Sequence, residues 1–85
     1  MESFNYTIKD PEGIHARPAT VLVQACKKFD CVINIAKGDT KVDAKRIFGI
    51  MGLGAKKGDV IVLSFVGDDE KDAFCKIKGI VEENF

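Results

Sequence analysis

VIVLSFV, residues 60–66, is the most strand-like run in this sequence of 85 residues, because β-branched and aromatic side chains dominate it. It follows a turn at residues 57–59 and ends before Gly67. Both faces of this strand are apolar, so we expect it to lie in the middle of a sheet. The rest of the chain must then supply its neighbouring strands and a cover for its buried face.

Three further segments show the two-residue period of half-buried strands. Residues 3–8 alternate between apolar and polar side chains and end at Asp10-Pro11-Glu12-Gly13, a turn by composition. Residues 31–36 and 40–44 alternate in the same way on either side of Lys37-Gly38-Asp39. This pair predicts a hairpin closed by a glycine turn.

Helical periodicity marks three other segments. Ala16 to about Lys28 predicts an amphipathic helix of about three turns. The glycine-rich stretch from Lys45 to Gly54 predicts a short helix in its first part, weakened by Gly49 and Gly52. Residues 67–70 supply a break, a candidate N-cap and an acidic first turn for a final helix. The apolar stripes of the two long helices are Ala19, Leu22, Val23 and Cys26, then Ala73, Phe74, Ile77, Ile80 and Val81.

The predicted element order is βαββαβα, within one domain covering residues 1–85. Two amphipathic helices need one apolar surface to cover, and four strands provide it. We therefore expect an α+β fold, an open-faced two-layer sandwich with a mainly antiparallel four-stranded sheet. Periodicity does not predict the strand order.

Composition excludes several classes of protein. Thirteen basic residues balance thirteen acidic ones, so no basic patch for nucleic acid is expected. No run approaches the about 18 apolar residues that span a bilayer, and no signal peptide is recognisable, so we expect a cytoplasmic protein without membrane insertion. Cys26, Cys31 and Cys75 have neither disulfide-framework nor zinc-site spacing, and we interpret all three as reduced small hydrophobes.

GIHARPAT, residues 13–20, contains the only histidine of the chain. Pro18 suits the first turn of a helix, which places His15 at or near the N-cap. The free N–H groups of Ala16 and Arg17 would then point outward, where an anion such as phosphate is favoured. Arg17 adds a charged fork for phosphate oxygens, and a neutral imidazole is a nucleophile toward phosphorus.

A lone histidine at a helix start is also commonly a simple cap or a solvated side chain, so this motif alone leaves phosphoryl chemistry open. We expect no metal, because no second histidine exists and no cysteine is suitably spaced. A hydrolase is unsupported, because the sequence has neither a GxSxG motif nor a triad partner beside His15.

The whole chain resembles the histidine-containing phosphocarrier family, HPr, of the bacterial sugar phosphotransferase system. The resemblance rests on GIHARPAT, on VDAKRIFGIMGLGAKKGD at 42–59 and on GDDEKDA at 67–73. It implies a sheet of four antiparallel strands covered by three helices. It also implies a carrier without independent turnover or cofactor: phosphorylated enzyme I transfers a phosphoryl group to Nδ1 of His15, which passes it to IIA domains of sugar permeases. Arg17 and the backbone amides of Ala16 and Arg17 would steady that group.

The resemblance also implies a docking surface around the helix start and the short second helix, on a chain expected to be monomeric. Its apolar part would be Ile47, Phe48 and Met51, although these side chains could instead pack into the core. Its polar rim would be Thr20, Gln24 and Lys27.

The sequence departs from the family pattern at two positions. Arg46 occupies the place of the regulatory serine of Gram-positive relatives, so we expect no serine switch there; Thr40 and Ser64 do not match that position. Glu12 replaces a small polar residue, and we expect it either to pair with Arg17 or, more simply, to point to solvent.

Two alternatives to the carrier stay open. A regulatory HPr paralogue would signal by docking on a transcription factor or kinase, but such relatives typically lack the histidine and keep the serine. A generic interaction module would carry His15 incidentally. The sugars served do not follow from the sequence.

Overall fold

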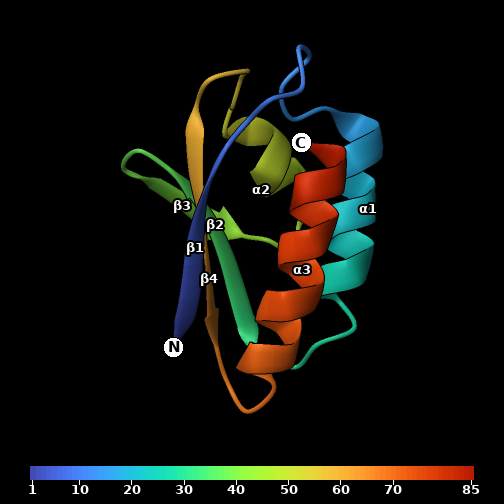
Figure 1. Cartoon of the computed structure of the whole chain (residues 1–85), viewed down its shortest axis with the longest axis vertical. Helices are drawn as coiled ribbons and strands as arrows, with labels where there is room; N and C mark the ends of the chain where they lie inside the picture. The colour runs from blue at the N-terminus through green and yellow to red at the C-terminus, as the bar shows by residue number, and fades with distance from the viewer.

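The strand at residues 60–66 lies inside the sheet, as the sequence predicts. A computed structural model describes all residues from 1 to 85. In it, β4 (Val60–Val66) pairs with β1 (Glu2–Thr7) on one side and β2 (Val32–Lys37) on the other. β3 (Thr40–Asp43) pairs with β2 and completes the order β1-β4-β2-β3, with every pair antiparallel (Figure 1).

Only one face of the sheet is covered. Ile61, Leu63 and Phe65 of β4 point inward and are fully buried. The alternate residues of the same strand lie on the open outer face, where Val60, Val62 and Val66 are exposed. The apolar pattern on both faces therefore predicted the central position of β4 correctly, but it does not mean that both faces are covered.

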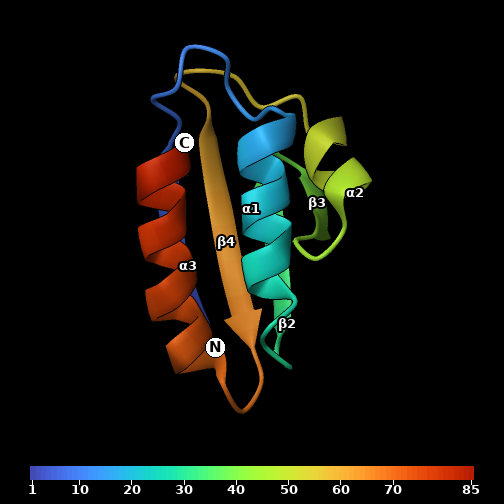
Figure 2. The ribbon, with the colours of Figure 1, turned by 90° about the vertical axis from the view of Figure 1, so that its right-hand side faces the viewer.

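Three helices form the second layer, and α1 (Ala16–Cys26) lies beside α3 (Glu70–Asn84) over the sheet (Figure 2). α2 (Ile47–Gly52) is the expected short helix next to α1. The predicted stripes face the sheet: Ala19, Leu22, Val23, Cys26, Ala73, Ile77 and Val81 are buried, and Phe74 and Ile80 are partly buried. No helix combines the length and apolar character needed to cross a membrane.

The first helix ends at Cys26, two residues before the predicted end near Lys28. The amide of Lys28 donates to the carbonyl of Ala25, and that of Phe29 donates to the carbonyl of Cys26. These bonds span three residues and tighten the last turn, which ends the regular helix.

The cysteine prediction was right for two residues and wrong for the third. Cys26 and Cys31 are buried, and burial raises the pKa of their thiols to about 12 and about 11 respectively. Cys75 is exposed, because it lies off the Ala73–Ile77–Val81 stripe of α3. All three are free thiols.

Asp69 occupies the N-cap position of α3, where the sequence predicts an acidic cap, but its side chain does not cap that helix. Its carboxylate instead accepts hydrogen bonds from the amides of Asp30 at 2.8 Å and Cys31 at 2.9 Å. Asp69 therefore fastens the turn that leads into β2 onto the start of α3.

Candidate functional site

The loop between β1 and α1 carries His15 and is held by two distant parts of the chain. The amides of Lys9 and Asp10 donate to the carbonyl of Phe85 at 2.7 and 2.9 Å. Ile8 exchanges backbone hydrogen bonds with the turn before β4, its amide donating to Asp59 and its carbonyl accepting from Gly58. The loop is therefore positioned by the end of α3 and by the α2–β4 connection.

Gly13 fixes the path of the loop just before the histidine. Its φ of 68° lies in the left-handed region, and its amide donates to the carbonyl of Asp10 at 2.9 Å. A methyl group at this position would overlap the carbonyl oxygen of Ala55 and lie 2.8 Å from Cα of Lys56. The next amide, of Ile14, donates to that same carbonyl at 3.1 Å. Only glycine allows this close approach.

His15 is the N-cap residue of α1, as predicted. Its backbone is extended and its carbonyl accepts from the amide of Ala19 at 3.0 Å, but its side chain makes no capping hydrogen bond. The ring is about one-third exposed, with a side-chain exposure of 35%. The amides of Ala16 and Arg17 donate to no protein acceptor, and Pro18 has no N–H, so the helix start presents two unpaired donors.

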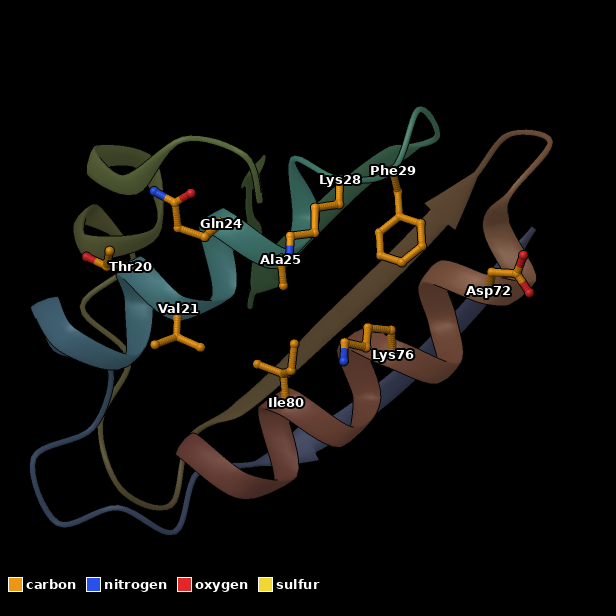
Figure 3. A pocket seen from close by; sticks show the side chains of 9 residues that line it. All are labelled: Thr20, Val21, Gln24, Ala25, Lys28, Phe29, Asp72, Lys76 and Ile80. Carbon is orange, nitrogen blue, oxygen red and sulfur yellow. The ribbon is translucent and has the colours of Figure 1, made fainter.

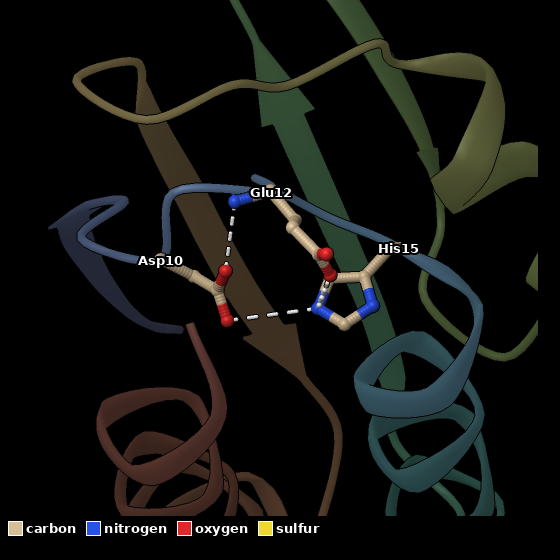
Figure 4. A group of neighbouring side chains, drawn as sticks. All are labelled: Asp10, Glu12 and His15. Carbon is tan, nitrogen blue, oxygen red and sulfur yellow. Dashed lines mark hydrogen bonds and ion pairs between the residues drawn. The ribbon is translucent and has the colours of Figure 1, made fainter.

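Two carboxylates face one edge of the histidine ring, which the sequence did not predict. Nε2 lies 3.5 Å from Oε2 of Glu12 and 3.6 Å from Oδ2 of Asp10 (Figure 4). The other oxygen of Asp10 accepts the amide of Glu12 at 2.8 Å, which holds the Asp10 side chain in place. Glu12 does not pair with Arg17. Its side chain is 74% exposed, in line with the expectation that it points to solvent, but the turn at 10–13 also brings one of its carboxylate oxygens near the ring.

Arg17 is exposed in the first turn of α1, and its guanidinium makes no salt bridge. A positive group without a carboxylate partner, one turn from the ring, can accept an anion without first breaking an ion pair. The geometry therefore brings a histidine, two free amides and a free guanidinium to one helix start.

The expectation of no metal rested on the lack of a second histidine and of suitably spaced cysteines, and it did not consider carboxylates near His15. The ligand atoms of Asp10, Glu12 and His15 lie within 4.8 Å of one another. A histidine nitrogen and carboxylate oxygens are common ligands of divalent cations. The lack of a second histidine does not by itself exclude a metal at this position.

The expected docking residues other than Lys27 lie on α1 and α2, which sit side by side (Figure 2). Lys27 is the C-cap residue of α1, about three turns from His15, so the structure does not bring it to the histidine. Thr20, Gln24 and Lys27 are exposed, and the hydroxyl of Thr20 donates to the carbonyl of Ala16 at 2.8 Å. Phe48 is 89% exposed and Met51 is 38% exposed. Ile47 is only partly exposed and packs against the core.

Arg46 is the N-cap residue of α2, and its side chain makes no capping hydrogen bond. Its Nε lies 3.9 Å from Oδ2 of Asp43, and its side chain is 82% exposed. This residue presents a positive charge at the helix start, where an N-cap serine would present a hydroxyl.

A groove of about 540 Å³ separates α1 from α3 (Figure 3). Its apolar lining comes from Val21, Ala25, Phe29 and Ile80. Thr20 and Gln24 lie at one end of it, so the groove adjoins the predicted polar rim.

Comparisons with known proteins agree with the fold and give its family. The family model described as the PTS HPr component phosphorylation site matches residues 2–83. A crystal structure of HPr from Thermoanaerobacter tengcongensis, with 42% sequence identity, has a TM-score of 0.92 and covers 100% of this chain and 96% of that chain. The histidine-containing phosphocarrier protein of Mycoplasma is 32% identical, with a TM-score of 0.94 and coverage of 96% and 93%.

The chain belongs to the HPr family, whose members are small phosphocarrier proteins of the phosphotransferase system. Crh of Bacillus subtilis, a catabolite repression protein, is also similar: it is 33% identical, with a TM-score of 0.78 and coverage of 93% and 91%. That structure is described as a dimer with a swapped domain. The structures similar to this chain therefore include both a phosphocarrier and a catabolite repression protein, and at least one of them is a dimer.

Proposed function

We propose that this chain accepts a phosphoryl group from phosphorylated enzyme I on Nδ1 of His15 and passes it to IIA domains of sugar permeases. The observation that carries the proposal is the position of the ring. His15 is the N-cap residue of α1, and its side chain makes no capping hydrogen bond. Two unpaired amides lie at the same helix start, and the Arg17 guanidinium makes no salt bridge.

The chemistry needs no group beyond this chain and its partners. The lone pair of Nδ1 forms the new bond to phosphorus while the bond between phosphorus and the donor breaks. The guanidinium of Arg17 and the amides of Ala16 and Arg17 donate hydrogen bonds to the phosphoryl oxygens, in a field of the helix start that favours an anion by about 0.3–1 kcal/mol. Because the group is then passed on, the protein is a carrier without turnover of its own.

The docking proposal rests on exposure around the ring. Phe48 and Met51 supply apolar contact area, and Thr20, Gln24 and Lys27 supply a polar rim. Ile47 contributes less contact area, because its side chain packs against the core. We propose a cytoplasmic monomer, since a carrier must present one histidine to several partners in turn.

The regulatory alternative is supported by the similarity to Crh. Two residues favour the carrier: the histidine is present, and Arg46 leaves no hydroxyl at the start of α2. A chain with this pair of residues has the acceptor of a carrier without the acceptor of a serine switch.

Phosphorylation by enzyme I tests the proposal. The protein is mixed with enzyme I, magnesium and phosphoenolpyruvate at neutral to alkaline pH, then followed by intact-mass spectrometry and phosphorus NMR. We expect one acid-labile phosphoryl group on the parent and none on His15→Ala, followed by transfer to IIA domains. A parent that takes no phosphoryl group would rule out the carrier. Phosphorylation without delivery to any IIA domain would favour the regulatory paralogue.

A further inference from the structure

The two carboxylates beside His15 act on the ring by charge. Their separations from Nε2, 3.5 Å and 3.6 Å, are longer than those of a good N–H···O hydrogen bond. Two negative charges at this range still act on the ring nitrogen through space, because they interact with the dipole of the imidazole without a hydrogen bond. Figure 4 shows the other ring nitrogen, Nδ1, directed away from both carboxylates, on the side of the first turn of α1.

The preference concerns where a neutral imidazole keeps its single proton. A lone pair on Nε2 would face two anions, whereas an N–H at Nε2 turns the positive end of its dipole toward them. The proton therefore belongs on Nε2 and the lone pair on Nδ1. The nitrogen that faces the unpaired amides of the helix start is then the nucleophilic one.

We propose that Asp10 and Glu12 are positioning residues that hold a proton on Nε2 of His15 through the whole cycle of phosphoryl transfer. The inference rests on the proposed role of His15 as the acceptor. Neither carboxylate touches the phosphoryl group. Each acts through the ring, by keeping the proton on the nitrogen that does not react.

The proton never has to move. On acceptance, the Nδ1 lone pair binds phosphorus, the donor leaves with its electron pair, and the ring becomes a cation that retains its Nε2 proton. On delivery, the acceptor attacks phosphorus, the Nδ1–P bond breaks, and its electron pair returns to Nδ1. The ring then leaves as neutral imidazole, whereas without the Nε2 proton it would have to leave as an anion. Asp10 and Glu12 balance the positive charge of the intermediate stage.

Asp10 is the better fixed of the two. Its amide donates to the carbonyl of Phe85, and its second carboxylate oxygen accepts the amide of Glu12. The Glu12 side chain is 74% exposed, against 29% for Asp10, so solvent weakens its charge more. No other carboxylate lies within 4.0 Å of the ring, and Arg17 is the neighbouring charge on α1. We therefore assign the larger share of the effect to Asp10.

The tautomer of His15 is the direct test, and it needs no phosphorylation. Long-range proton–nitrogen spectra of the nitrogen-15-labelled protein above pH 8 report one histidine only, so the assignment is unambiguous. We expect the Nε2–H tautomer in the parent and an increase of about threefold in the Nδ1–H fraction in the double variant Asp10→Asn/Glu12→Gln. Asp39→Asn/Asp68→Asn removes two exposed charges elsewhere and should leave the ratio unchanged. An Nδ1–H tautomer in the parent, or equal ratios in all three proteins, overturns the proposal.

The phosphorylated state supplies the second readout. Phosphoramidate, a small phosphoryl donor, can load the histidine without enzyme I, and phosphorus NMR then gives the hydrolysis rate against pH. The reactive form carries the Nε2 proton, which the carboxylates favour. Their removal should therefore shift the onset of acid lability downward, by about half a pH unit.

The two proposals fail separately. A parent that enzyme I cannot phosphorylate removes the carrier function and leaves the tautomer result to be judged by itself. A parent that enzyme I phosphorylates, but whose tautomer and lability profile match those of the double variant, removes only the role of Asp10 and Glu12.

Discussion

An aspartate anchors a loop at each end of the molecule, and the two side chains are used differently. At the end where α3 begins, both oxygens of Asp69 accept backbone amides, at 2.8 and 2.9 Å. At the other end, one oxygen of Asp10 accepts an amide at 2.8 Å, while the second lies 3.6 Å from the histidine ring. Both carboxylate oxygens of Asp69 are therefore hydrogen-bonded to the backbone, whereas only one carboxylate oxygen of Asp10 is.

The two aspartates therefore differ in role: Asp69 holds the backbone, whereas Asp10 can also act on a neighbouring side chain. A carboxylate whose oxygens are both hydrogen-bonded to amides has little left to offer a reacting group. A carboxylate held by one oxygen keeps a fixed position and leaves its second oxygen free to act on a neighbour. The loop at the site end is therefore held by Asp10 and also by backbone contacts at Phe85 and Gly13.

Phe85→Ala should have the largest effect on the site end. The ring is 3% exposed, and its loss should cost about 3 kcal/mol of unfolding free energy, measured by urea denaturation. Because the Phe85 carbonyl also holds Lys9 and Asp10, phosphoryl acceptance by His15 should slow as well. Phe48→Ala is the control, since Phe48 is 89% exposed and should leave stability unchanged. Equal stability of Phe85→Ala and the parent would mean that α3 does not anchor the loop.

Gly13→Ala should come next, at about 2 kcal/mol, because a left-handed backbone and a clash with Ala55 act together. Gly38→Ala separates these two causes. Gly38 also has a positive φ, of 58°, but nothing lies within 4 Å of its added methyl group, so it should cost only about 1 kcal/mol. If the two variants lose equal stability, the close approach to Ala55 contributes nothing.

Asp69→Asn tests the opposite end through pH. The amide of Asp30 donates to Asp69 and lowers the pKa of its carboxyl below the ordinary 3.8. A lowered pKa means that this stabilisation is complete above about pH 4 and is lost as the pH falls through the folded-state value. The parent should therefore lose more stability than Asp69→Asn on acidification from pH 5 to pH 2, in urea titrations. An Asp69→Asn curve parallel to the parent would contradict the assignment.

Cysteine alkylation should show the smallest effect, and it reports directly on the turn that Asp69 holds. Exposed Cys75 should react with iodoacetamide first, while Cys26 and Cys31 are protected by burial and by pKa values raised to about 12 and about 11. Peptide mass spectrometry should show faster alkylation of Cys31 in Asp69→Asn. Asparagine has one acceptor oxygen where Asp69 uses two, and the substitution removes the negative charge that helps to raise the pKa of Cys31. Cys75 is the internal reference. Unchanged Cys31 reactivity would mean that Asp69 does not hold this turn closed.

Local patterns were sufficient for most of the fold. Residues 60–66 indicated the central strand, and the stripes of α1 and α3 indicated which faces are buried, because periodicity reports directly on burial. Pro18 predicted correctly that His15 lies at a helix start, because proline suits the first turn of a helix. The order β1-β4-β2-β3 could not be predicted, since pairing depends on contacts between segments far apart in the sequence.

The electrostatics of the site were beyond the sequence for the same reason. The sequence marked Asp10 only as part of a turn, and it marked Glu12 as a departure from the family pattern. The approach of both carboxylates to Nε2 depends on a loop path set by Phe85 and Ala55. The sequence predicted an N-cap for the last helix within residues 67–70, but the side chain of Asp69 instead bonds to amides almost forty positions earlier in the chain. Side chains that act on distant segments carry no periodic signal.

The positions of the two chain ends have a practical consequence for work with this protein. Phe85 lies against the loop that carries Asp10, whereas Met1 lies near the other end of the molecule (Figure 1). A purification tag or fluorophore joined after Phe85 would emerge beside the loop that carries Asp10 and His15. The same group joined before Met1 would lie away from this loop, so fusions for binding experiments are best built at the amino end.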